Sequence, residues 1–161
     1  MCGNSNRPAV GGTIAVLFPP MNSRSSSPES SLSSSPDSIM SSTSMSSYSL
    51  FFRESEADSR TKAIFRIDDA ETYNALRAFR QVDMRIEKYG DLSIGQPAAP
   101  PLHQFRLDLA KQTPRSFQTD VIIELPERLD LGVSEKGVVG RQITMTETDG
   151  SVLGVGIVGY N

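Results

Sequence analysis

The chain has one cysteine and one histidine among its 161 residues, and this scarcity excludes several kinds of site. Cys2 alone cannot form an intramolecular disulfide, and Cys2 with His103 cannot supply the four ligands of a usual structural zinc site. Asp68, Asp69 and Glu71 have the chemistry to bind a divalent cation, but helix capping explains these carboxylates more simply. We therefore expect no metal and no cofactor, and these counts suit a reducing compartment.

Long apolar runs and an excess of basic charge are also missing. No stretch approaches the roughly 18 apolar residues of a membrane span, and no basic segment leads into a long apolar run as in a secretion signal. The formal net charge is −3 and the pI is about 5.2, which disfavours a dedicated nucleic-acid binder because phosphate affinity depends largely on concentrated Lys and Arg. We expect a cytoplasmic protein without a transmembrane segment.

No catalytic motif in the sequence identifies a reaction. The chain contains neither a G-x-S-x-G nucleophile elbow nor a G-x-x-x-x-G-K-S/T phosphate loop. A Cys2–His103 pair is disfavoured because a nucleophile needs a base held beside it, and Cys2 lies near the N-terminus in a predicted arm. The sequence therefore predicts a protein that is not an enzyme.

The first 60 residues are predicted to form an arm outside the folded domain. Residues 21–49 contain sixteen serines, and such a segment cannot bury enough apolar surface to offset its ordering entropy. Ser27 and Ser35 precede Pro-Glu and Pro-Asp, so they are candidates for phosphorylation, although a merely solvated linker is an equal alternative. The short apolar segment 11–18 is expected to be an edge strand, a disordered apolar segment, or a docking segment that adds to a sheet edge.

Residues 61–161 have the periodicity of a folded α+β domain. Alternating apolar and polar residues predict strands at 62–68, 82–87, 105–109, 117–125, 141–148 and 152–160. An apolar stripe that includes Leu76 and Phe79 predicts a helix from about Asp69, with Asp68 and Glu71 as its capping box. We expect a mostly antiparallel sheet of five to six strands, with this one main helix packed on a face.

The last two predicted strands contain the clearest turn signal and the candidate interface. Asp149-Gly150 between two apolar runs is typical of a β-hairpin. Glycines 154, 156 and 159 predict a bulge or the close approach of another backbone. An exposed strand edge in this region, together with segment 11–18, could pair with a neighbouring chain. The candidate interface residues are Ile14, Val16, Phe18, Val155 and Ile157.

A second candidate surface is basic and consists of Arg66, Arg77, Arg80, Arg85 and Lys88. Acidic residues of equal number intervene in this part of the chain, so a mixed solvated surface is the default interpretation. The strand–helix–strand–strand order begins like an RNA-recognition fold, but paired aromatic residues for base stacking are absent from its third strand. Direct nucleic-acid binding is therefore less favoured than protein contact.

The order of elements resembles that of rhabdovirus matrix proteins, in which an arm containing proline and serine precedes a strand, a helix and an antiparallel sheet. The similarity extends to Leu-Pro-Glu-Arg at 125–128, Lys-Gly at 136–137, and Gln-Ile-Thr-Met-Thr at 142–146 before an acidic turn. The resemblance implies a viral structural protein that self-associates and bridges a nucleocapsid to the inner face of a membrane, in the host cytoplasm or the virion. The alternative is a nucleic-acid-associated viral accessory protein of the movement or silencing-suppressor type.

Overall fold

The computed structural model describes residues 12–20, 45–92, 99–110 and 120–161. The phosphorylation candidates Ser27 and Ser35 lie outside these ranges. In chain order the described residues form β1 (Thr13–Leu17), β2 (Tyr48–Glu54), β3 (Thr61–Arg66), α1 (Ala70–Ala78), β4 (Gln81–Ile86), β5 (His103–Asp108), β6 (Asp120–Glu124), β7 (Gln142–Glu147) and β8 (Val152–Tyr160).

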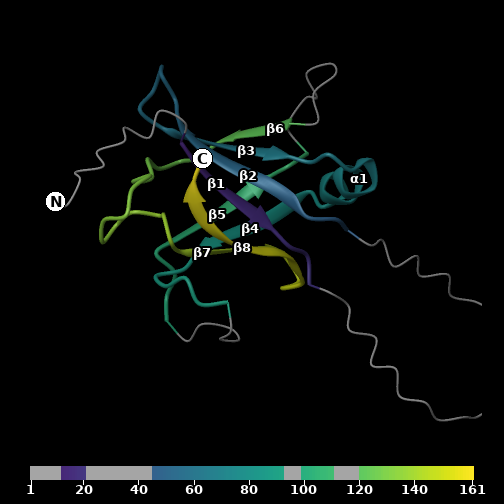
Figure 1. The fold of residues 1–161 in the computed structure, drawn as a ribbon. Helices are drawn as coiled ribbons and strands as arrows, with labels where there is room; N and C mark the ends of the chain where they lie inside the picture. The colour runs from purple at the N-terminus through teal and green to yellow at the C-terminus, as the bar shows by residue number, and fades with distance from the viewer. Residues whose placement is uncertain (1–11, 21–44, 93–98, 111–119) are drawn as a thin grey trace, which may run out of the picture.

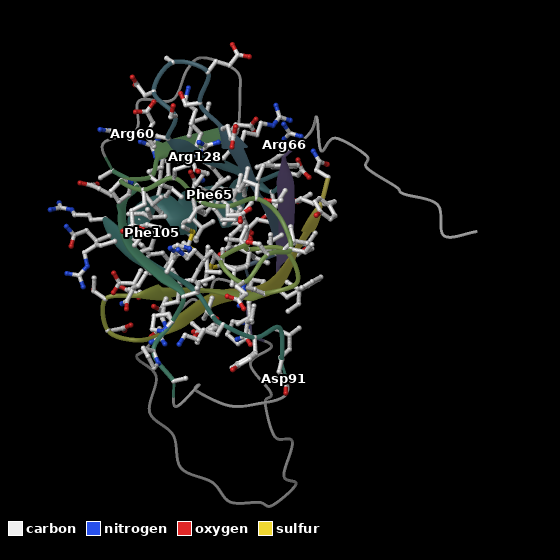
Figure 2. The ribbon with its side chains drawn as sticks, turned by 90° about the vertical axis from the view of Figure 1, so that its left-hand side faces the viewer. Arg60, Phe65, Arg66, Asp91, Phe105 and Arg128 are labelled. Atoms are coloured by element: carbon white, nitrogen blue, oxygen red, sulfur yellow. The ribbon has the colours of Figure 1, made fainter. Side chains whose placement is uncertain are left out.

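The strands form one eight-stranded sheet in the order β5-β4-β7-β8-β1-β2-β3-β6, and every neighbouring pair is antiparallel. The sheet curls around its core into a nearly closed barrel, with α1 at one end (Figure 1). Strand alternation places every second side chain inside, so that Leu50, Met84 and Ile143 are fully buried. The aromatic rings of Phe65 on β3 and Phe105 on β5 also lie in this interior (Figure 2).

The expected α+β domain with five to six strands is wrong, because β1 and β2 also belong to the sheet. Both strands lie within the predicted arm of residues 1–60, and they occupy central positions between β8 and β3. β2 buries Tyr48, Leu50 and Phe52. The apolar run of β2 is short and lies between serine-rich and charged segments, so the composition of this region did not indicate a strand. The folded domain therefore includes strands that precede the expected boundary at residue 61.

The six strands expected after residue 60 are present, with small differences at their ends. The predicted hairpin between β7 and β8 is confirmed. Gly150 has a φ of 92°, its amide donates to the Glu147 carbonyl over 2.9 Å, and the Ser151 amide donates to an Asp149 carboxylate oxygen over 2.7 Å. A change of register between Met145 and Thr146 marks a bulge in this pair of strands.

Helix α1 begins one residue later than the capping box predicted, because Asp69 and not Asp68 caps it. The Asp69 carboxylate accepts hydrogen bonds from the amide and hydroxyl of Thr72, over 2.8 and 2.6 Å, and these bonds hold the pKa of Asp69 below its usual range. Phe79 has extended backbone angles and ends the helix. Leu76 is buried in the hydrophobic core, so the helix covers one end of the barrel.

The segment 126–141, here called the connector, packs against the other end of the barrel. The sequence of residues 127–137 indicates a charged link, but Leu129 and Val138 in the connector are almost completely buried. The Leu129 amide donates to the Thr61 hydroxyl over 2.8 Å, which joins the connector to β3. The Arg141 guanidinium donates to four carbonyl oxygens, those of Lys88, Ser134, Glu135 and Gly137. The connector is therefore an organised part of the fold.

Candidate interaction surface

The predicted interface residues come from two strands that lie side by side, β1 in purple and β8 in yellow (Figure 1). Ile14 pairs with Gly159, and Phe18 and Val155 exchange backbone hydrogen bonds of 3.0 Å in both directions. The same register sets Val16 beside Ile157. The structure therefore brings together all five candidates, but the expected exposed strand edge is wrong, because β1 also pairs with β2 and β8 also pairs with β7. We call Ile14, Val16, Phe18, Val155 and Ile157 the β1–β8 surface.

The β1–β8 surface faces outward because the strands alternate. Thr13, Ala15 and Leu17 point into the core and are almost completely buried. Val16 and Phe18 retain 41% and 59% of their surface exposure, whereas the other three members of the surface are half-buried. Apolar side chains therefore cover both strands on the side that faces solvent.

An apolar row that the sequence had not indicated continues from β1 to the edge of the sheet. Ile14 pairs with Phe51, Phe51 with Ile64, and Ile64 with Ile122 on β6. Ile122 is 41% exposed, but Phe51 is nearly buried because the Arg66 guanidinium lies 4.9 Å from its ring centroid. This row depends on the register between strands, which the sequence of each strand taken alone does not show.

The opposite part of the barrel wall, formed by β5, β4 and β7, is polar on its outer side. Arg106 binds Asp83 through two hydrogen bonds of 2.9 and 3.3 Å. The Gln142 side chain donates to the Thr144 hydroxyl over 3.2 Å. Polar side chains on this wall thus pair with one another, Arg106 with Asp83 between β5 and β4 and Gln142 with Thr144 along β7. The barrel surface is divided into an apolar part and a polar part.

The three glycines of β8 have different surroundings. A Cβ atom on Gly156 would lie 2.2 Å from the Val16 carbonyl oxygen, and one on Gly154 would lie 2.7 Å from the Tyr48 hydroxyl. Both glycines are therefore required by close contacts inside the barrel, where burial raises the pKa of Tyr48. At Gly159 the nearest atom to such a Cβ is the Ile14 carbonyl oxygen at 3.9 Å. Packing within the described residues does not require a glycine at this position.

The five candidate basic residues do not form one continuous patch. Arg66, on the outside of the sheet (Figure 2), is paired with Asp120 over 3.3 Å, and this hydrogen bond and charge raise the pKa of Arg66. Arg85 pairs with Glu87 over 3.0 Å, and Arg77 lies over the Tyr73 ring. Arg80 and Lys88 flank opposite ends of β4.

The described surface also has two depressions and one histidine. A depression of about 420 Å³ near the end of α1 is lined by Ala78, Phe79, Arg80, Gln81, Asp108, Ala110, Glu147 and Thr148. A second, of about 260 Å³, is lined in part by Glu54 and Arg128, which pair with each other over 2.8 Å. His103 lies 3.5 Å from Glu127 and stacks on Phe105. No group of three or more potential metal ligands is found in the described ranges.

Comparison with known proteins adds no family assignment. The sequence matches no protein-family model and no curated protein. Over the ranges that the structure describes, no helix has the length and apolar character needed to cross a membrane. The division of the barrel wall into apolar and polar parts is therefore the main structural basis for a functional proposal.

Proposed function

We propose that the protein is a non-enzymatic assembly protein that self-associates through protein–protein contacts at the β1–β8 surface. The observation that supports this proposal most directly is the continuous apolar surface formed by β1 and β8. Exposed apolar patches on folded proteins commonly mark interaction sites, and their burial contributes about 25 cal/mol for each Å² removed from water. The polar wall of β5, β4 and β7 remains available to water in such a complex.

The side chains of the β1–β8 surface suit protein contact better than small-molecule binding. Val16 and Phe18 protrude from a convex wall, and Val155 and Ile157 flank them on the adjacent strand. Ligand sites for small molecules are usually concave, with a few converging polar groups, and neither property applies to these five side chains. A flat or convex apolar surface is better covered by another protein surface.

The resemblance to rhabdovirus matrix proteins is the basis for a more specific version of the proposal. In that version the self-associated protein also contacts a nucleocapsid and the inner face of a membrane. The scattered and partly paired basic residues give no comparable support to the nucleic-acid alternative, since phosphate binding benefits from several free cations on one face.

Sedimentation velocity of the full chain tests the proposal of self-association. The measurement is made at rising protein concentration and with a reducing agent, so that disulfides through Cys2 do not contribute. We expect the weight-average sedimentation coefficient to increase with concentration. A strict monomer over the whole accessible range would contradict the proposal.

A further inference from the structure

We infer that the β1–β8 surface binds a second copy of the chain, about a two-fold axis that runs between β1 and β8 and parallel to them. This inference rests on the proposed self-association and names its geometry. Closed symmetric dimers bury the same surface on both copies, so a surface of this type must be complementary to itself. Three features of the β1–β8 surface and its surroundings meet this requirement.

The first feature is the match of side-chain size at the centre. The proposed axis exchanges the positions of β1 and β8, so that Val16 faces Ile157 of the second copy and Phe18 faces Val155 of the second copy. Ile14 then faces Gly159 of the second copy, where a large side chain meets a position without one. Since close contacts within the described chain do not require Gly159, this pairing gives the glycine a structural role.

The second feature is the neutral character of the side chains that flank Val16 and Phe18, since the nearest charged group, Arg66 over the Phe51 ring, is paired with Asp120. β7 lies outside β8 and presents Gln142 and Thr144, whereas β2 lies outside β1 and presents Ser49, preceded by Ser47. The axis places Gln142 opposite Ser49 of the second copy and Thr144 opposite Ser47 of the second copy. Association would therefore bury neutral polar groups that can bond to each other or to water, without burying an unpaired charge.

The third feature is the distribution of charge at the two margins. When the strand registers are extended, Arg85 and Asp68 lie on opposite sides of one transverse row, and Glu87 and Arg66 lie on opposite sides of the next. Within the chain Arg85 pairs with the nearly buried Glu87, and Arg66 pairs with Asp120. A two-fold axis through the middle brings opposite ends of each row together. Arg85 then lies toward Asp68 of the second copy, and Glu87 toward Arg66 of the second copy. Because the wall is convex, these charges act at longer range, where they favour this orientation during encounter.

The size of the surface predicts weak association. Its outward residues occupy two adjacent strands, whereas stable dimers usually bury about 800 Å² on each partner. A contact of this size can contribute to an assembly in which each copy has several neighbours. We therefore expect dimers to appear at high protein concentration.

Sedimentation equilibrium of matched aspartate variants tests the location of the contact. Val16 and Ile122 are equally exposed, at 41%, on the outer side of the same sheet, but only Val16 belongs to the β1–β8 surface. We expect Val16→Asp to weaken association by more than about tenfold, because it places an unpaired carboxylate in an apolar contact. We expect Ile122→Asp to associate like the unchanged chain.

Two further variants test the arrangement. Gly159→Val has room in the monomer but fills the space that would receive Ile14 of the second copy, so we expect loss of association with an unchanged circular dichroism spectrum. Asp68→Lys places like charges at the margins, so we expect weaker association at low salt and little difference at high salt. Asp58→Lys makes the same charge change in the exposed turn between β2 and β3 and is the control.

The outcomes separate the arrangement from the proposed function. If the unchanged chain associates but Ile122→Asp, and not Val16→Asp, abolishes association, the two-fold arrangement is wrong and self-association stands. The same conclusion follows if Gly159→Val, correctly folded, associates like the unchanged chain. If the unchanged chain is monomeric at every concentration, both the arrangement and the proposed function fail.

Discussion

Gly156 of β8 and the Val16 carbonyl of β1 are so close that a Cβ atom on the glycine would lie 2.2 Å from the carbonyl oxygen. Backbone atoms of a central strand cannot move aside as the end of a flexible side chain can. The close approach of these two strands holds the apolar side chains of the β1–β8 surface next to one another. A glycine at position 156 is therefore part of the structural basis of this surface.

Replacing Gly156 should destabilise the barrel. We expect Gly156→Ala to lower the free energy of unfolding by about 1–3 kcal/mol, because the added methyl group forces β1 and β8 apart. Gly159→Ala is the matched control: it has space for the methyl group, so the free energy should stay the same or rise by up to about 1 kcal/mol. Urea unfolding followed by circular dichroism measures both changes, and equal losses in the two variants would contradict this interpretation of Gly156.

Removing the first 60 residues should prevent folding. A chain of residues 61–161 lacks β1 and β2, so β8 and β3 lose the two strands between them. We expect poor dispersion of amide proton shifts in NMR spectra of this fragment, in contrast to the full chain. A milder test of the same point is Phe52→Ala in the full chain, which should lower the free energy of unfolding by about 3–5 kcal/mol because Phe52 is fully buried. A folded and cooperative fragment would restore the domain boundary at residue 61.

The cap of α1 should make stability depend on pH in the acidic range. Hydrogen bonds from Thr72 lower the pKa of Asp69 in the folded state, so its stabilising contribution is present above the unfolded pKa and is lost as pH falls through the folded pKa. Asp69→Asn can still cap the helix but cannot titrate. The usual pKa of an aspartate side chain is about 4. Below about this pH we expect the unchanged chain to lose stability more steeply than Asp69→Asn. Parallel denaturation curves from pH 6 to pH 2 measure this difference, and Asp68→Asn is the control because Asp68 does not cap the helix.

Replacing Arg141 should loosen the connector without unfolding the barrel. The planar guanidinium donates to four carbonyl oxygens, a geometry that the single ammonium of lysine cannot reproduce. We expect Arg141→Lys to increase hydrogen exchange at the amides of Val138 and Val139, which are bonded to the Asp130 and Gly132 carbonyls. Exchange in β3 and β4 should remain slow. Unchanged protection of the connector would show that its own backbone bonds are sufficient.

Local sequence patterns were sufficient to predict those elements whose signal lies within a few consecutive residues. The alternation of Val82, Met84 and Ile86 and the turn at Asp149-Gly150 depend on neighbouring residues alone, and both were correctly predicted. β2 was missed because its five-residue core, Tyr48 to Phe52, stands beside a serine-rich segment that dominates the local composition. The position of the helix cap differed by one residue, since Asp68 and Asp69 are adjacent and both have suitable side chains, and the structure shows Asp69 accepting the bonds from Thr72.

The interface residues show the same difference between what local sequence patterns predict and what strand pairing decides. The sequence identified Ile14, Val16, Phe18, Val155 and Ile157 as apolar residues on two candidate strands, but not that these strands pair with each other. It also could not indicate the apolar row to Ile122. This row depends on strand order and register, which arise from contacts between residues far apart in the chain.

By itself the sequence determined which segments after residue 60 alternate, where the hairpin turns and that one helix follows the first of these strands, because hydrophobic periodicity and turn chemistry act within a few residues. Only the tertiary structure decided that β1 and β2 complete the sheet, that β1 lies against β8, and that the outer wall is apolar on one part and polar on another. The physical reason is that burying β1 and β2 requires partners distant in sequence. Those pairings become favourable when the whole barrel encloses a common core.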